Sequence, residues 1–142
     1  MTTISENNNK DIVLTMKRLI LACALALVTF AVSAASFPDV KIDDLKSAIA
    51  SKNVTVIDVN GSDSWKEGHI PGALDFETVK ANLATVLPKD KSALVVAYCG
   101  GPKCQAYQAA AKAAKELGYK NVKHLSAGIS GWRAAGEKTE RG

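Results

Sequence analysis

The chain has 142 residues, of which 47% are hydrophobic and 23% are charged, enough apolar sequence for the core of one domain but not comfortably for two. Its formal net charge is +4. The lysines are spread along the sequence rather than gathered in one run, which indicates a solvated basic surface and argues against a nucleic-acid-binding protein.

The N-terminal segment has the build of an export signal. Lys17 and Arg18 precede an apolar run over residues 19–32, and small residues follow at 33–35. This is the three-part pattern of a secretory signal peptide. The apolar run is shorter than the roughly 20 residues that a bilayer-spanning helix needs, so we expect the segment to be cleaved rather than to anchor the chain.

Cleavage is expected after Ala34 or Ala35, with no stable membrane association of the mature protein. Met16 is the more natural start of translation, because the residues before it are polar and unpatterned. The sequence therefore predicts that residues 1–35 are an N-terminal extension with a cleaved signal peptide and that residues 36–142 are a single domain. The predicted location is periplasmic or secreted.

The first half of this domain alternates helical and strand patterns. Residues 42–52 carry apolar side chains at helical spacing and acidic residues in the first turn, which predicts an amphipathic helix. The β-branched run over residues 54–59 predicts a strand. Ser62 is a plausible cap of one helical turn, a Gly-His-Ile-Pro-Gly bend follows at 68–72, and a helix is expected through residues 77–87.

The second half repeats the alternation. Residues 92–98 are continuously apolar, as expected of a central parallel strand that is buried on both faces. A helix is expected over residues 105–117 with Gly118 as its stop, then a short strand over residues 121–125 and a last helix over residues 128–136. Short alternating units of this kind predict an α/β fold with a mainly parallel sheet.

Cys99 stands where the apolar strand ends and the next helix is about to begin. This is the carboxyl edge of the sheet, where open α/β folds bind ligands. Gly100 and Gly101 let the backbone bring N–H groups close to one point, and such a nest lowers the pKa of a thiol. Lys103 adds a charge that can attract an anionic substrate. Cys99 is therefore a candidate nucleophile, and the alternative is a cysteine that packs as a small hydrophobe.

Two stretches of this sequence resemble the rhodanese family. Residues 95–136, "VVAYCGGPKCQAYQAAAKAAKELGYKNVKHLSAGISGWRAAG", are similar to its C-terminal half, in which a Tyr-Cys, four loop residues and an Ala-rich helix precede a glycine-rich turn and a tryptophan. Residues 54–76, "VTVIDVNGSDSWKEGHIPGALDF", resemble its strand signature and Gly-His-Ile-Pro-Gly-Ala motif. The resemblance covers residues 40–136. It implies an α/β rhodanese-like fold with a mainly parallel central sheet flanked by helices.

The resemblance also implies a sulfurtransferase. Cys99 would attack the outer sulfur of a small anionic donor such as thiosulfate or polysulfide, hold that sulfur as a persulfide, and pass it to a thiol, a cyanide-type acceptor or an acceptor protein. No metal or organic cofactor is implied. The active loop would comprise Gly100, Gly101, Pro102, Lys103 and Cys104. The backbone N–H groups of this loop would stabilise the charged sulfur. Pro102 has no N–H and can only shape the loop.

Two departures from the family pattern concern charge. The family usually has an arginine two residues after the strand aspartate, and here Asn60 follows Asp58 at that position, so an ion pair or anion contact of family members is not carried over. Asp58 itself is expected to fix loops at the sheet edge by hydrogen bonds. In the active loop Lys103 is the single cation. This one charge does not establish thiosulfate as the donor.

Cys104 allows two interpretations. It is either a small residue tolerated at the last loop position or the first turn of the helix, or a second thiol that resolves the Cys99 persulfide or locks Cys99 in a disulfide. An exported protein meets oxidants and keeps disulfides. The spacing of five residues does not by itself distinguish a tolerated small residue from a second functional thiol.

The remaining conspicuous residues are predicted to be structural. His69 is expected to bond backbone through its ring and His124 to be a packed or surface residue. Neither pairs with other ligands at metal spacing, so no metal site is predicted. Trp132 is predicted to support the site by packing and by walling the pocket, and residues 126–128 are predicted to lie beside Cys99.

Two further function classes are weighed against the enzyme. One is a sulfur-carrier or protein-binding module with little turnover of small donors. The other is a phosphatase of the same fold, whose loop would be one residue longer and would end in an arginine that grips phosphate. Here Cys104 and Gln105 occupy those positions and the loop has no arginine, which argues against the phosphatase.

Overall fold

The computed structural model describes residues 36–142. The expected signal peptide, its cleavage site and the start at Met16 lie outside the described residues and stay predictions. Within the described residues, no helix is both long enough and apolar enough to cross a membrane.

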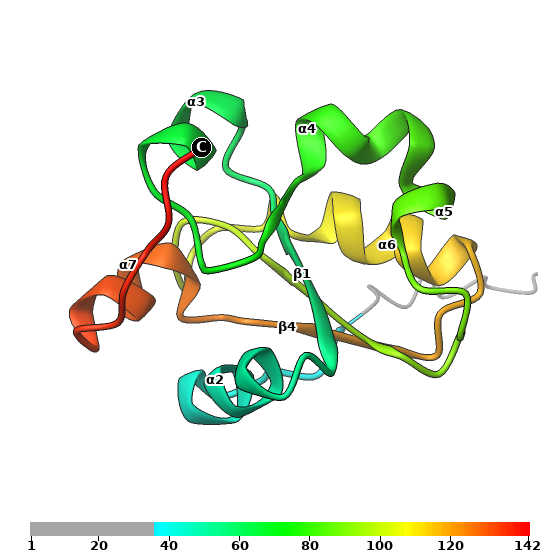
Figure 1. The fold of residues 1–142 in the computed structure, drawn as a ribbon, viewed down its shortest axis with the longest axis horizontal. Helices are drawn as coiled ribbons and strands as arrows, with labels where there is room; N and C mark the ends of the chain where they lie inside the picture. Colours follow the sequence, from blue (N-terminus) through cyan, green and yellow to red (C-terminus); the bar gives the residue numbers. More distant parts are fainter. Residues whose placement is uncertain (1–35) are drawn as a thin grey trace, which may run out of the picture. The chain divides into compact units, whose positions relative to one another are not determined.

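A four-stranded sheet forms the centre of the domain (Figure 1). Its strands, in spatial order, are β2 (Leu74–Asp75), β1 (Val54–Asp58), β3 (Leu94–Tyr98) and β4 (Asn121–His124). Every pairing between these neighbours is parallel. The predicted α/β fold with a mainly parallel sheet is confirmed. The two-residue strand β2 was not predicted, because a strand this short leaves no alternation to detect.

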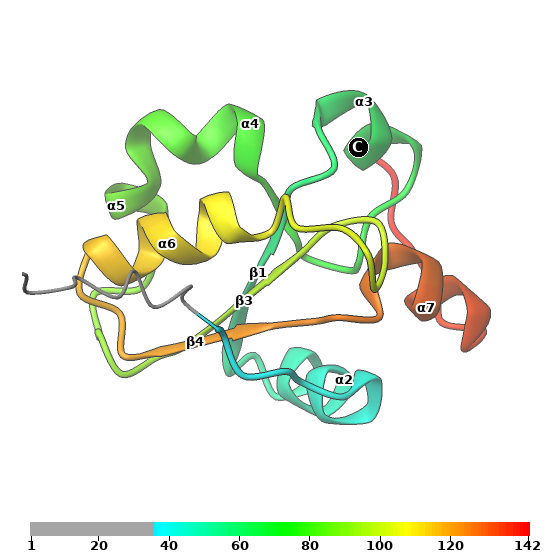
Figure 2. The ribbon, with the colours of Figure 1, turned by 180° about the vertical axis from the view of Figure 1, so that it is seen from behind.

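Helices cover both faces of the sheet, as Figures 1 and 2 show from opposite sides. α2 (Ile42–Ala50) and α7 (Gly128–Ala134) lie toward one face, and α4 (Phe76–Val79), α5 (Leu83–Val86) and α6 (Gln108–Glu116) lie toward the other. The short helix α3 (Ser62–Glu67) follows β1 at the carboxyl edge. Crossover helices are what parallel strands require as connections.

Two core clusters lie on the two faces. The first core cluster contains Phe37, Ile57, Leu83, Leu87, Val95, Ala97, Cys99, Tyr107, Ala110, Ala111, Ala114, Tyr119 and Val122. The second core cluster contains Val40, Leu45, Val56, Ile70, Ala73, Val96, Tyr98, Leu125 and Trp132. Residues of β3 alternate between the clusters because successive strand side chains point to opposite faces. Continuing that alternation by one residue directs Cys99 into the first cluster.

The helix expected over residues 77–87 is wrong as a continuous element. The structure breaks it into α4, a 3₁₀ turn η1 (Lys80–Asn82) and α5. The Asp75 side chain caps α4 by accepting a hydrogen bond from the Glu77 N–H. Asn82 leaves the helical conformation at φ −127° and ψ 26°. The helix is interrupted at this residue, and asparagine is one of the residue types that favour helix interiors less than alanine or leucine does.

Two helix starts also differ from the expectation. Ser62 is the first residue of α3 rather than its cap, which is Gly61, and the Ser62 hydroxyl instead donates to the Asp75 carboxylate at 2.5 Å. α6 begins at Gln108 and not at residue 105. The three preceding residues form tight turns closed by bonds such as Gln108 N–H to the Gln105 carbonyl, so the loop after β3 is longer than predicted.

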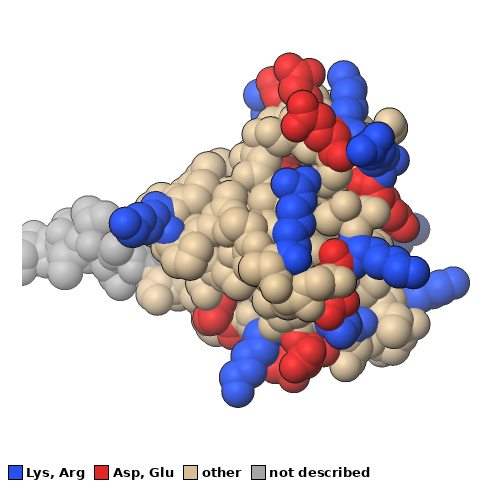
Figure 3. All heavy atoms as spheres, turned by 90° about the vertical axis from the view of Figure 1, so that its left-hand side faces the viewer, with Lys and Arg blue, Asp and Glu red and all other residues tan. Residues whose placement is uncertain are grey.

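Basic and acidic side chains are interspersed on the molecular face shown in Figure 3. No patch of a single sign dominates this face. This agrees with the solvated surface that the scattered lysines predict.

Candidate active site

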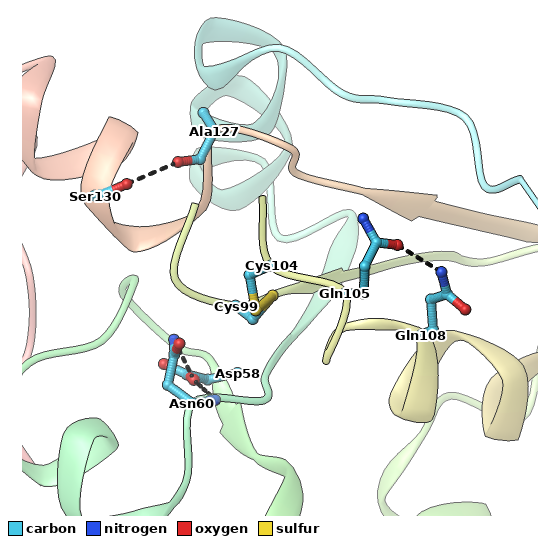
Figure 4. The surroundings of a disulfide bond; sticks show 8 residues. All are labelled: Asp58, Asn60, Cys99, Cys104, Gln105, Gln108, Ala127 and Ser130. Atoms are coloured by element: carbon cyan, nitrogen blue, oxygen red, sulfur yellow. Dashed lines mark hydrogen bonds between the residues drawn. A yellow bond between two sulfur atoms is a disulfide. The ribbon is translucent and has the colours of Figure 1, made fainter. Parts of the chain in front are cut away.

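Cys99 directly follows β3 at the carboxyl edge of the sheet, where the chain turns away into the loop that leads to α6 (Figure 4). It is 1% exposed and belongs to the first core cluster. The strand below it is fixed on both sides, by β1 and by β4. The position of the thiol is therefore set by the centre of the fold.

The Cys99 and Cys104 sulfur atoms form a disulfide (Figure 4). Their Cα atoms are 6.2 Å apart, inside the range of about 4.4–6.8 Å that a disulfide allows. Cys104 is partly buried and packs against the first core cluster. The structure therefore shows Cys104 as a partner of Cys99 and places it in the loop, four residues before α6, rather than in a helical turn.

The backbone of the loop leaves several donors unused. The N–H groups of Gly100, Gly101 and Lys103 donate to no oxygen of the residues that the structure describes. The Cys104 N–H, expected to stabilise the charged sulfur, instead donates to the Gly101 carbonyl at 3.0 Å and closes a turn within the loop. Pro102 and Lys103 form the exposed tip. Three N–H groups of the loop, rather than the expected four, are thus without a protein acceptor among the described residues.

The start of α7 holds the other side of the loop. The Ile129 N–H donates to the Cys99 carbonyl at 2.9 Å, and the Ser130 N–H donates to the Gly100 carbonyl at 3.0 Å. Gly128 has φ +60°, and a Cβ added to it would lie 2.5 Å from the Gly101 nitrogen and 2.6 Å from the Cys99 oxygen. Residues 126–128 therefore do lie beside Cys99, as predicted, and glycine is required for that approach.

Asp58 joins two strands and a loop beneath the site. Its Oδ2 accepts from the Tyr98 hydroxyl at 2.5 Å, and its Oδ1 accepts from the backbone N–H and the side-chain amide of Asn60 at 2.7 and 2.9 Å. The same Tyr98 hydroxyl accepts from the Ile70 N–H at 3.0 Å. The predicted hydrogen-bonding of Asp58 is confirmed. Burial, followed by the hydrogen bond to Asp58, raises the pKa of Tyr98 far above its ordinary value, so its hydroxyl keeps the proton that it donates.

Asn60 stands beside the active loop. A Cβ on Gly100 would lie 3.8 Å from its Oδ1. Asn60 also lines a surface hollow of about 360 Å³ together with Asp63 and Glu77. The residues that line this hollow include two carboxylates and no cation, so this side of the loop offers an anion no attraction.

The other predicted structural residues lie apart from the cysteines. Trp132 is 3% exposed, donates from Nε1 to the Lys138 carbonyl at 2.8 Å, and packs in the second core cluster, on the opposite face from Cys99. The His69 ring bonds the Trp65 carbonyl at 2.7 Å, as expected. His124 stacks on Tyr107 with ring centres 3.4 Å apart, and burial lowers its pKa.

Two features were not predicted, namely the hydrogen bond of Tyr98 to Asp58 and the need for glycine at position 128. Tyr98 reads as one more apolar residue of a buried strand, and only the tertiary structure brings its hydroxyl to Asp58. The signal for Gly128 is its place in "SAGISG", where this glycine is the first residue of α7. Among residues 36–142, no group of three metal-ligating side chains lies together.

Replacing Tyr98 by phenylalanine is expected to lower the free energy of unfolding by about 1–3 kcal/mol, because it removes the hydrogen bond to Oδ2 of the buried Asp58 carboxylate and leaves the Ile70 N–H without a partner. Denaturant unfolding measures the change. In a double-mutant cycle with Asp58→Asn, the two losses should be less than additive. Additive losses would show that the two side chains do not interact.

The fold and the site define a class of protein, a parallel α/β domain in which a cysteine begins the loop at the carboxyl edge of the sheet. The model of the Rhodanese-like domain family matches residues 41–135. The chain belongs to this family, which confirms the resemblance seen in the sequence.

Individual proteins of known sequence or structure are also similar to this chain. The chain is 31% identical over 103 residues to thiosulfate sulfurtransferase GlpE of Shewanella oneidensis, covering 70% of this chain and 96% of that protein. It is 34% identical over 90 residues to an HTH-type transcriptional regulator of Mycobacterium tuberculosis, covering 63% of this chain but only 38% of the regulator. The solved rhodanese-like domain of an Anabaena protein superposes with a TM-score of 0.58 at 27% identity, over 75% of this chain and 80% of that one.

Proposed function

We propose that this chain is a sulfurtransferase that carries sulfane sulfur as a persulfide on Cys99. The observation that carries the proposal is the position of Cys99 at the end of a buried parallel strand, followed by a loop with unused N–H groups. Backbone N–H groups of a loop that converge on one point stabilise an anion. The similarity to GlpE along nearly its whole length supports the same activity.

The proposed cycle has two transfers and starts from the reduced protein. The Cys99 thiolate attacks the outer sulfur of the donor, the sulfur–sulfur bond of the donor breaks, and its remainder leaves with the electron pair, as sulfite when the donor is thiosulfate. An acceptor thiol or cyanide then takes the outer sulfur of the persulfide and restores the Cys99 thiolate. The disulfide must be opened first, because a Cys99 sulfur that is bonded to Cys104 has no thiolate with which to attack the donor.

The charges around the loop bear on the donor. Lys103 is exposed at the tip and can attract an anion. Asn60 supplies no charge where family members usually have arginine, and Asp63 and Glu77 stand on the adjoining hollow. A dianion such as thiosulfate is thus bound more weakly here than by a site with an arginine at position 60. Polysulfide is the second donor to compare.

Mass spectrometry of the reduced protein after exposure to each donor tests the proposal. Trypsin cuts after Lys103 and places Cys99 and Cys104 in separate peptides, residues 92–103 and 104–112. We expect the mass of one added sulfur on the first peptide. No added sulfur with any donor would contradict the enzyme and favour the carrier or protein-binding module.

The same proposal includes export to the periplasm or beyond, supported by the pattern of residues 16–35. Protein recovered from the periplasmic fraction is expected to begin at Ala35 or Ser36, as read by N-terminal sequencing. A Leu25→Arg variant, which interrupts the apolar run, should stay uncleaved in the cytoplasm. An N-terminus at Met1 or Met16 in the periplasmic fraction would contradict the prediction.

A further inference from the structure

We infer that Cys104 is a resolving thiol that expels the sulfur held on Cys99 as hydrosulfide, which makes the chain a sulfide-releasing enzyme that depends on an external dithiol. The inference rests on the proposed function, since it needs the Cys99 persulfide. It adds an outcome for the transferred sulfur, a role for Cys104 and a class of partner.

The two sulfur atoms are bonded to each other within the folded domain. Cys99 is held by β3 below it and by the Ile129 N–H on its carbonyl. Cys104 follows the exposed tip of the loop and bonds to Cys99 with the surrounding strands and helices all in place. The bond is therefore compatible with the folded sheet and helices, and the residues between the two cysteines all belong to the loop.

No third cysteine in the described domain could pair with Cys99. Of the three cysteines in the chain, Cys23 lies in the N-terminal extension, and residues 36–142 contain only Cys99 and Cys104. A persulfide on Cys99 thus meets one internal nucleophile, five residues away. Thiols held this close react far faster than the same thiols free in solution.

Burial favours the internal attack. Cys99 is 1% exposed in the bridged protein, and the Cys104 side chain packs against the same apolar cluster. In the disulfide the Cys104 sulfur thus reaches Cys99 from within the loop, on the side that the apolar cluster covers. The same approach would bring Cys104 to the inner sulfur of a Cys99 persulfide.

The chemistry balances without an added oxidant. The Cys104 thiolate attacks the Cys99 Sγ, the bond between Sγ and the outer sulfur breaks, and the outer sulfur leaves with the electron pair as hydrosulfide. The proton of the Cys104 thiol is passed to solvent or to the leaving sulfide. The sulfane sulfur gains two electrons, and the two thiols lose two electrons as they form the disulfide.

The exposure of the two cysteines determines which sulfur atom an external reductant attacks when it opens the disulfide. A dithiol reductant can reach Cys104, which is partly exposed, whereas Cys99 is closed off. Attack on the Cys104 sulfur expels Cys99 as a thiolate beside the unused N–H groups of Gly100 and Gly101. The second thiol of the reductant then frees Cys104, and the nucleophile is ready for another donor.

An anaerobic single-turnover experiment tests the inference. Reduced wild type, Cys104→Ser, Cys104→Ala and Cys99→Ser are mixed with thiosulfate or 3-mercaptopyruvate, with no other thiol present, and sulfite or pyruvate is measured beside sulfide. Wild type should release sulfide in an amount equal to the co-product, and its peptides 92–103 and 104–112 should become linked. The two Cys104 variants should release co-product but little sulfide and should keep the added sulfur on Cys99.

Other results overturn the inference. If wild type releases co-product but retains the sulfur on Cys99 as the Cys104 variants do, the resolving role is wrong and the proposed function stands. If no protein releases co-product from either donor, the proposed function fails and the inference fails with it. With dithiothreitol added after loading, sulfide release should be independent of its concentration in wild type and proportional to it in Cys104→Ser, and equal dependence in both would also overturn the role.

Discussion

Replacing Cys99 by alanine is expected to reduce sulfur transfer to the background rate, a loss of about 10⁴-fold or more in kcat/KM as for other nucleophiles that have been removed. Cys104 is the other thiol of the loop, and we expect it to resolve the Cys99 persulfide rather than to take sulfur from the donor. The reduced proteins should be compared by the formation of thiocyanate from thiosulfate and cyanide. Cys99→Ser should behave in the same way, since a hydroxyl cannot accept the sulfur.

The loss should be separable from a loss of fold. Alanine at position 99 removes one buried sulfur atom, and we expect the free energy of unfolding to fall by about 1 kcal/mol relative to reduced wild type. Reduced protein is the correct reference, because the variant cannot form the disulfide. Substantial turnover in a folded Cys99→Ala protein would show that another residue is the nucleophile. The double variant with Cys104→Ser would then show whether that residue is Cys104.

Replacing Gly128 by alanine is expected to damage both stability and transfer. The side chain would meet the Gly101 nitrogen and the Cys99 oxygen at 2.5 and 2.6 Å, both of them backbone atoms. The left-handed conformation and the clash together should cost about 2 kcal/mol or more in the free energy of unfolding. Since the clash pushes the active loop out of place, transfer should fall by about 100-fold in molecules that remain folded.

Gly136 provides a matched control at the other end of α7. It has φ +78°, and nothing lies within 4 Å of a Cβ placed there. Gly136→Ala should therefore show only the cost of the backbone conformation, about 1 kcal/mol, with transfer unchanged. Denaturant unfolding and thiocyanate formation on both variants measure the difference. Equal effects of the two substitutions would show that the contact of Gly128 with the loop is unimportant.

The order of helices and strands could be predicted because their side-chain patterns are local. The continuous apolar run ending at Tyr98 indicates a strand buried on both faces, and the structure gives β3 there. The break at Asn82 and the late start of α6 at Gln108 could not be predicted. Both depend on backbone hydrogen bonds of turns, which compete with helix formation over one or two residues.

The site could be located from the sequence but not described in detail. Cys99 at a strand end predicts the edge of the sheet, whereas its bond to Cys104 depends on how the loop folds back. The bond between Tyr98 and Asp58 joins residues 40 positions apart, and no local pattern indicates it. Trp132 shows the opposite case, because its motif suggested a pocket wall and the fold turns it to the other face of the sheet.

The parallel pairing of β1 with β3 also constrains the route by which the chain folds. Asp58 pairs with Tyr98 across 40 positions, and closing so long a segment costs conformational entropy before any contact repays it. We therefore expect this domain to fold more slowly than a helical bundle of similar length. Since β3 is the strand that joins β1 to β4, the newly made chain has no edge on which to place Cys99 until this distant pairing forms, and both thiols remain open to unwanted oxidation during that interval.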